Sequence, residues 1–228
     1  MLFDRCESRL QPTKSGREGE RPYWNYEDIG IFLLVLSALS TILELLARLH
    51  LFPRSELEHP GFGLQISVIF ALMLALYLIL KLRYRLGVLR PLGWIRPHTN
   101  VIIIAPLLGV LLAEAVVLLS HAPAQNTTTM PLLQALALGL VFGPILEESF
   151  FRGFLLPVLA CSLGKTLAVI LTAFLFALFH GPGNLAHWAF LIGTGLAYGW
   201  IRVACRSSTA AALAHAAYNL VLLLLARP

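Results

Sequence analysis

Long apolar stretches dominate this chain of 228 residues and limit what it can fold into. Hydrophobic residues make up 58% of the chain and charged residues only 13%, a composition that excludes an ordinary soluble domain. A helix rises 1.5 Å per residue, so about 20 apolar residues cross a hydrocarbon core of roughly 30 Å. Seven stretches come close to this length: 29–52, 62–82, 100–120, 131–159, 165–181, 185–204 and 207–226. We therefore expect an all-α fold, a polytopic transmembrane helix bundle of about seven to eight spans.

The boundaries of these stretches divide the chain into three parts. Residues 1–28 are polar and predict a cytoplasmic N-terminal arm, and residues 29–130 contain the first transmembrane helices. Residues 131–226 form a second helical part, which contains the polar residues described below. The stretch 131–159 is longer than one crossing needs, so we expect it to be tilted, or broken near Gly143-Pro144 into two pieces.

Basic residues predict how the bundle is oriented in the membrane. Alternate loops are rich in Lys and Arg (Arg5, Arg9, Lys14, Arg17 and Arg21; Lys81, Arg83, Arg85, Arg90 and Arg96; Lys165; Arg202 and Arg206), whereas the intervening loops hold only Arg54. The positive-inside rule then gives a cytoplasmic N-terminus. We expect an integral membrane protein of a bacterial inner membrane rather than of the endoplasmic reticulum. The net charge of +5 indicates contact with anionic membrane lipid, and no basic module indicates a nucleic-acid partner.

Three charged residues lie inside the apolar stretch 131–159. They belong to Gly-Pro-Ile-Leu-Glu-Glu-Ser-Phe-Phe-Arg, residues 143–152. A charge at the bilayer centre costs about 2.5–3.5 kcal/mol on insertion scales, so such residues usually face a partner or a wet cavity. Glu148 and Arg152 are four residues apart and can pair on one helix face. Glu147 lies about 100° around the helix and has no obvious local partner.

Other polar residues lie at similar depths in later stretches. His180 ends Phe176-Ala-Leu-Phe-His180, and His215 and Asn219 share one face of the last stretch. From the cytoplasmic ends, the helical rise places Glu147 about 18 Å deep, His180 about 22 Å, and His215 and Asn219 about 10 and 16 Å. Three helices therefore carry Glu, His, His and Asn to overlapping depths.

This set of groups favours hydrolysis by an activated water molecule. A shielded carboxylate beside an imidazole can hold and deprotonate water, while a second imidazole and an amide can stabilise an oxyanion. Metal binding is the rival use, because Glu147, His180 and His215 match the first shell of a catalytic zinc. However, His-Glu-x-x-His is absent and the two histidines come from different stretches, so we favour no cofactor, with a divalent metal such as zinc as the alternative.

Three motifs resemble those of a known family. Glu147-Glu148-x-x-x-Arg152, Phe176-x-x-x-His180 and His215-x-x-x-Asn219 are similar, in order, to the motifs of the CPBP intramembrane proteases. This family includes the type II CAAX prenyl endopeptidases and relatives described as bacteriocin-processing or abortive-infection proteins. The resemblance covers roughly residues 131–226, which would then be the catalytic core.

The resemblance implies a role for each motif residue. Glu147 would be the base that activates water, and His180 would help to position that water. His215 and Asn219 would form the oxyanion site. Glu148 and Arg152 would support the geometry of the first motif. The expected partner is a membrane-associated or lipidated peptide or protein, including a prenylated CAAX-type substrate.

Two other functional classes remain open at this point. Intramembrane Glu, His and Arg residues also form proton relays, so a proton-coupled transporter is an alternative, although no inverted repeat supports it. A non-catalytic immunity or scaffold member of the same fold is the other. Glu114, solitary in the third stretch, predicts a structural hydrogen bond rather than catalysis.

Overall fold

The computed structural model describes residues 24–58, 60–120, 130–181 and 183–225, and within these ranges the regular structure is helical, without strands. Three segments, labelled η, have wider turns of the π-helix type. The elements are α1 (Tyr26–Arg48), α2 (Arg54–Glu58), α3 (Phe62–Leu78), η1 (Ile79–Arg83), α4 (Thr99–Ser120), α5 (Leu132–Leu136), η2 (Ala137–Phe142), α6 (Gly143–Glu147), η3 (Glu148–Leu155), α7 (Leu156–Leu163), α8 (Lys165–Phe179), α9 (Leu185–Cys205) and α10 (Ser208–Leu225). The expected helical bundle is therefore confirmed.

Six helical segments of the described chain are long and apolar enough to cross a membrane. They are Tyr26–Arg48, Phe62–Arg83, Thr99–Leu119, Leu132–Leu163, Leu185–Cys205 and Ser208–Leu225. The remaining predicted stretch, 165–181, forms the shorter helix α8 of 15 residues, about 22 Å long. His180 directly follows the last residue of α8.

The long stretch 131–159 forms one continuous helix, α5 to α7, and is not broken at Gly143-Pro144. Pro144 lies inside this helix, directly after η2, whose wider turns accommodate the local change in hydrogen bonding. The wider turns of η3 leave backbone carbonyls free for other donors. Phe154 O accepts from the indole Nε1 of Trp24 (2.7 Å), and Arg152 O accepts from Arg202 Nε (3.2 Å). Two distant segments are thereby fixed to this helix.

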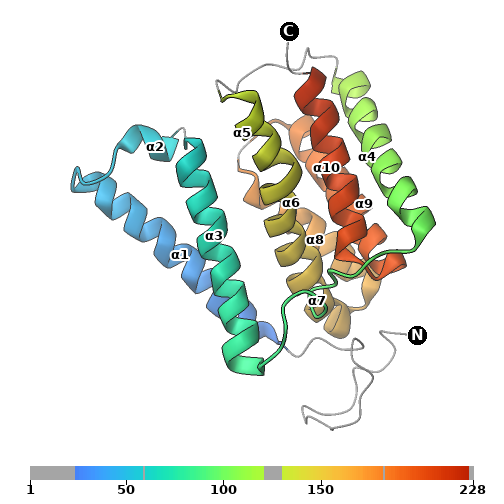
Figure 1. The fold of residues 1–228 in the computed structure, drawn as a ribbon, viewed down its shortest axis with the longest axis horizontal. Helices are drawn as coiled ribbons and strands as arrows, with labels where there is room; N and C mark the ends of the chain where they lie inside the picture. Colours follow the sequence, from blue (N-terminus) through green and yellow to red (C-terminus); the bar gives the residue numbers. More distant parts are fainter. Residues whose placement is uncertain (1–23, 59, 121–129, 182, 226–228) are drawn as a thin grey trace.

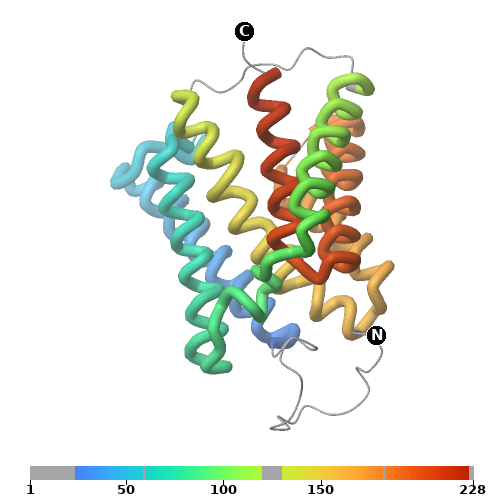
Figure 2. Tube along the Cα trace, turned by 45° about the vertical axis from the view of Figure 1, so that its right-hand side comes forward, coloured from blue at the N-terminus to red at the C-terminus, as the bar shows by residue number. Residues whose placement is uncertain are grey.

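The bundle has two sides, with the long helix between them. In Figures 1 and 2, α10 lies between α4 and the α5–α7 helix, while α1, α2 and α3 lie on the other side of α5–α7. The largest core cluster joins α1 to η3 through aromatic rings: Phe32 stacks on Phe150 at 4.5 Å and Trp24 on Phe154 at 5.4 Å. This packing holds the first span against the helix that carries Glu147.

The connection between η1 and α4 packs against the same end of the bundle. Leu92 is fully buried, and its carbonyl accepts from Ser208 Oγ at the start of α10 (2.6 Å). Trp94 Nε1 donates to Ser149 Oγ in η3 (2.8 Å). Nearby, the Tyr84 hydroxyl donates to the buried Asp28 carboxylate, and burial raises the pKa of Tyr84 to about 12. This connection therefore closes one end of the bundle below the charged residues of η3.

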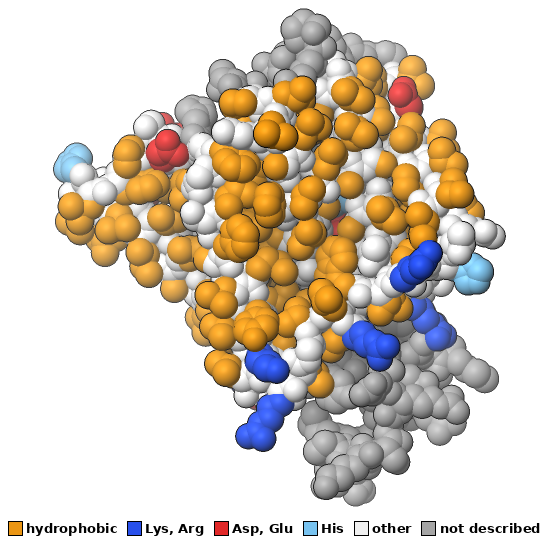
Figure 3. Space-filling view, in the orientation of Figure 1, with side chains coloured by type: hydrophobic (Ala, Val, Ile, Leu, Met, Phe, Trp, Pro, Cys, Tyr) orange, Lys and Arg blue, Asp and Glu red, His pale blue; other side chains and the backbone are white. Residues whose placement is uncertain are grey.

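The surface agrees with the charge pattern of the sequence. Figure 3 shows a face covered mostly by hydrophobic side chains, with Lys and Arg gathered toward its lower end and acidic side chains near its upper end. The cytoplasmic N-terminus stays a prediction from this asymmetry. Residues 1–23, most of the predicted polar arm, lie outside the described residues; the helix α1 begins at Tyr26, with Asn25 as its N-cap.

Candidate active site

The carboxylate of Glu147 lies between the two histidines of the later motifs. Glu147 is the last residue of α6, His180 follows the last residue of α8, and His215 lies in α10. Glu147 Oε2 is 3.8 Å from His180 Nε2 and 3.8 Å from His215 Nε2. The side chains of Glu147 and His180 are 27% and 31% exposed, whereas that of His215 is 5% exposed. The structure thus brings three predicted residues together, with access from the Glu147–His180 side.

Hydrogen bonds fix how both histidines face Glu147. His180 Nδ1 is 2.8 Å from the backbone oxygen of Phe176, which can only accept, so Nδ1 carries the proton. His215 Nδ1 is 2.9 Å from Glu148 Oε1, another acceptor. In the neutral form, each imidazole therefore presents the lone pair of Nε2 toward Glu147.

The predicted pair of Glu148 and Arg152 forms, and both side chains are fully buried. Arg152 Nη1 donates to Glu148 Oε1 (3.2 Å), and Arg152 Nη2 donates to Gly195 O in α9 (3.1 Å). The guanidinium carbon also lies 4.6 Å from the centre of the Phe176 ring, within the range of a cation–π contact. Glu148 therefore accepts from both Arg152 and His215, and joins η3 to α10.

Asn219 lies one turn beyond His215, as the spacing predicts, but its amide is used differently. Asn219 Nδ2 donates to the backbone oxygen of Gly139 in η2 (2.8 Å). An amide nitrogen carries two hydrogens, so one N–H stays available after this bond. The structure anchors Asn219 to the long helix rather than pairing it with Glu147.

Sequence reasoning missed the contribution of α9. Gly195 and Gly199 of α9 pack closely against α8. The same face of α9 carries Tyr198, whose ring stacks on His215 with centroids 4.9 Å apart. The signal in the sequence was the spacing of Gly195 and Tyr198, which are three residues apart and therefore lie on one face of a helix.

Buried polar atoms without a hydrogen-bond partner gather at this cluster. Five such side-chain atoms occur in the described ranges, and four belong to Glu147 (Oε2), Glu148 (Oε2), Arg152 (Nε) and Tyr198 (the hydroxyl). Unpartnered buried groups cost about 1–3 kcal/mol each and are rare in folded proteins. Their concentration here indicates a site built to hold a small polar molecule.

The distances from Glu147 to the two histidines can be compared with those that a zinc ion and a water molecule require. The part of the chain that the structure describes contains no group of three His, Cys, Asp or Glu residues arranged to hold a metal. Zinc bonds of about 2.0–2.1 Å in a tetrahedron place ligand atoms roughly 3.3 Å apart. The two separations of 3.8 Å from Glu147 Oε2 exceed that value, whereas a water about 2.8 Å from both atoms of either pair is feasible.

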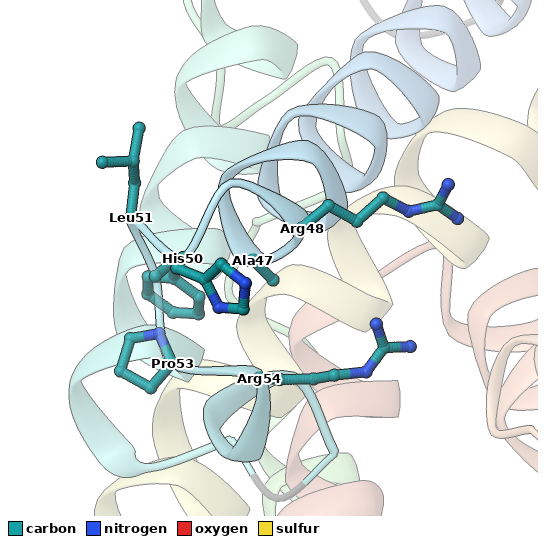
Figure 4. Close-up of a pocket in the computed structure, with 7 residues that line it drawn as sticks. Ala47, Arg48, His50, Leu51, Pro53 and Arg54 are labelled. Atoms are coloured by element: carbon teal, nitrogen blue, oxygen red, sulfur yellow. The ribbon is translucent and has the colours of Figure 1, made fainter.

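Two other features lie apart from this cluster. A pocket of about 640 Å³ lies at the turn from α1 to α2, where Arg48 and Arg54 extend in the same direction (Figure 4). Glu44 Oε1 lies 3.0 Å from Arg48 Nε and 3.7 Å from Arg54 Nη1, so these charges compensate one another. Glu114 is exposed on α4, and the structural hydrogen bond that we predicted for it is not found among the described residues.

Comparison with known proteins locates a family match in the same part of the chain. Residues 128–221 match a family model described as Rce1-like: Type II CAAX prenyl endopeptidase Rce1-like. The match extends into α10 as far as residue 221 and contains all seven motif residues described above. No curated protein and no solved structure matches the chain.

Proposed function

We propose that this integral membrane protein, whose residues 128–221 match the Rce1-like family model, is an intramembrane endopeptidase that hydrolyses a peptide bond by glutamate-activated water. The observation that carries this proposal is the convergence of Glu147 with the Nε2 atoms of His180 and His215. A carboxylate and two oriented imidazoles are suited to hold and deprotonate one water molecule.

In the first step, Glu147 acts as the general base. The water oxygen attacks the carbonyl carbon of the scissile bond while its proton passes to the Glu147 carboxylate. His180, whose Nδ1 proton is fixed on Phe176 O, presents Nε2 to orient the same water. The partial exposure of these two side chains leaves room for the substrate carbonyl.

In the second step, the oxyanion of the tetrahedral intermediate needs donors. His215 enters this step as an imidazolium, having taken a proton from solvent before the substrate binds. It donates Nδ1–H to Glu148 and Nε2–H toward the oxyanion, keeps both protons through the step, and has its charge balanced by Glu148. The second N–H of Asn219 is the other donor. The C–N bond then breaks, and the leaving amine takes the proton held by Glu147.

The substrate class follows from where the base lies. Glu147 is in a helix long enough to span the membrane, so the scissile bond must approach within the membrane or at its surface. A peptide made membrane-associated by a lipid group meets this requirement, in keeping with the prenyl endopeptidase relatives. We propose a lipidated or otherwise membrane-bound peptide, with a prenylated CAAX terminus as the first candidate.

The test uses the purified full chain in lipid vesicles with a quenched fluorescent peptide ending in a prenylated cysteine and three further residues. Glu147→Gln keeps the side-chain shape and removes the base, so we expect hydrolysis to be lost while the melting midpoint is retained. Glu114→Gln, a carboxylate change of the same kind on α4, is the matched control and should keep full activity.

A parallel measurement covers substrates other than this peptide. Mass spectrometry compares the termini of membrane peptides in cells that contain the wild-type protein or the Glu147→Gln variant. New termini should appear with the wild type alone. Wild-type rates in the Glu147→Gln variant would remove Glu147 from the mechanism, and identical termini together with an uncleaved test peptide would contradict the protease function.

A further inference from the structure

The face of the His215 imidazole is covered by one aromatic ring. Tyr198 in α9 is 1% exposed, and its ring lies 4.9 Å from the imidazole centroid at an interplanar angle of 19°. Offset stacking of this kind is among the favoured arrangements of aromatic pairs. The ring therefore restricts rotation of the imidazole out of its plane.

The other edges of the imidazole are also fixed. Nδ1 is held by Glu148, and the Phe176 ring approaches at 6.0 Å with an interplanar angle of 75°. Once these contacts and the Tyr198 ring are in place, Nε2 is directed toward Glu147 Oε2. Of the three restraints, only the Tyr198 ring fixes the plane of the imidazole.

Contacts with neighbouring side chains hold the Tyr198 ring in place against the His215 imidazole. The guanidinium carbon of Arg152 lies 5.4 Å from its ring centre, and the Phe176 ring lies 6.4 Å away at an angle of 88°. Tyr198 also belongs to a buried cluster with Ala105, Ala211 and Ala214 of α4 and α10. Its hydroxyl makes no hydrogen bond to any described residue, so any effect of Tyr198 on His215 must come from the ring.

We propose that Tyr198 is a positioning residue, whose ring keeps the His215 imidazole in the plane that points Nε2 at the reacting centre. The residue acts through His215 and does not touch the substrate. This role predicts that phenylalanine can replace Tyr198, whereas an aliphatic side chain of similar bulk cannot.

The first test needs no substrate and so does not depend on the proposed protease function. Histidine labelled with ¹⁵N reports which ring nitrogen carries the proton, and His215→Ala assigns the His215 signals. At a pH at which the imidazole is neutral, the wild type and Tyr198→Phe should show His215 as a single form with the proton on Nδ1. Tyr198→Leu should show averaging between the two tautomers.

The second test is kinetic and rests on the proposed function. With the prenylated test peptide, Tyr198→Leu should lower kcat about 10–100-fold with little change in KM, the scale expected when a catalytic group is misplaced by about 1 Å. Tyr198→Phe should stay within about threefold of the wild type. In a His215→Ala background, Tyr198→Leu should change the residual kcat less than about twofold, because its effect passes through His215.

Tyr218→Leu is the matched control. Tyr218 is a half-buried tyrosine of α10 that packs against the same cluster, and the structure gives it no ring contact with His215. This variant should keep the His215 tautomer and kcat, at comparable loss of thermal stability. A single Nδ1–H tautomer in Tyr198→Leu, or equal kcat losses with and without His215, would overturn the inference. If the NMR result holds and no variant or wild type cleaves peptide, the protease function fails and the positioning role stands.

Discussion

Glu148 Oε1 accepts hydrogen bonds from two side chains, Arg152 Nη1 in η3 and His215 Nδ1 in α10. Spacing predicted the first bond, because Glu148 and Arg152 are one helical turn apart. It gave no information on the second, since His215 lies 67 residues further along the chain. Local periodicity determines which side chains share a helix face, whereas contact between helices depends on packing that one sequence does not reveal.

Replacement of Glu148 should therefore remove two hydrogen bonds at once, those with Arg152 and His215. Glu148→Ala leaves the Arg152 guanidinium buried and uncompensated, and it frees His215 Nδ1. Breaking a buried pair costs about 3–5 kcal/mol in soluble proteins. We expect strongly lowered thermal midpoints for Glu148→Ala and Arg152→Ala, with the double variant far less destabilised than the sum of the two.

The exposed pair of Glu44 and Arg48 provides the control cycle. Their side chains are 38% and 71% exposed, and such pairs contribute about 0–1 kcal/mol. Glu44→Ala and Arg48→Ala should each change stability little and combine additively. Additive effects at Glu148 and Arg152 as well would show that the buried pair is not coupled.

Replacement of Asn219 distinguishes a catalytic role of its amide from a purely structural one. If its free N–H stabilises the oxyanion, Asn219→Ala should lower kcat about 10²–10³-fold with little change in KM, as for removal of one oxyanion donor elsewhere. If the amide only fastens α10 to Gly139 O, Asn219→Ala should instead lower the thermal midpoint, with a smaller loss of kcat. Kinetics and calorimetry on the same preparation distinguish the two outcomes.

Variants of the two histidines, together with chelation of the wild type, test the alternative in which the site holds a metal ion. Under the water mechanism, chelation leaves the wild-type rate unchanged, and His180→Ala and His215→Ala lose activity without a parallel loss of bound metal. Near-stoichiometric zinc that falls with activity across these variants, together with rescue of the chelated enzyme by zinc, would move the mechanism to metal-bound water.

At the scale of elements, the contact between α4 and α10 positions His215. A Cβ atom on Gly109 would lie 2.0 Å from the backbone oxygen of Ala214, the residue before His215. Only glycine allows the two helix backbones to approach this closely. Helix α4 carries none of the motif residues, yet it determines where α10 can lie.

Gly109→Ala should consequently displace α10. Overpacking typically costs about 1–3 kcal/mol, and here the clash is with backbone, which cannot rotate away. We expect a lower thermal midpoint and a lower kcat together. Gly193→Ala is the matched control: its Cβ would meet nothing within 4 Å, so stability should be unchanged or higher by up to about 1 kcal/mol, with full activity. Wild-type behaviour of Gly109→Ala would mean that the close approach is unimportant.

Hydropathy predicted where the helices are but not their detailed shapes. Apolar length located the spans, of which the 15-residue α8 is shorter than the other six, and the helix through Gly143-Pro144 is unbroken, one of the two alternatives predicted for it. Gly181-Pro182-Gly183 indicate where this stretch ends, and α8 ends at Phe179, two residues before the predicted bound. The wider turns of η2 and η3 leave no recognisable pattern in sequence, because their free carbonyls are satisfied by distant donors such as Trp24.

At the scale of the whole molecule, the basic loops and the turn from α1 to α2 lie at opposite ends of the bundle (Figure 1). Their charges predict that the η1–α4 connection is cytoplasmic and that α2 is outside. This orientation determines from which compartment a peptide reaches Glu147.

Cysteine labelling tests the orientation. In a cysteine-free background, Leu89→Cys and Ser55→Cys place one exposed thiol at each end. In right-side-out vesicles, a membrane-impermeant maleimide should label Ser55→Cys directly and Leu89→Cys only after permeabilisation. The reverse pattern would invert the predicted topology, and labelling of both without permeabilisation would contradict a sealed bundle with these ends on opposite sides.

The site residues lie far apart along the chain, so they enter the membrane at different times during synthesis of the protein. Glu147, Glu148 and Arg152 enter the membrane with the long helix, whereas His215 follows 67 residues after Glu148. Chains fold from their N-terminal parts first as they are made. The nascent protein therefore passes through a stage in which the charged pair is already inserted and one imidazole is missing. Under the proposed function, a protein assembled in this order stays inactive toward neighbouring peptides at the translocon until α10 has joined the bundle.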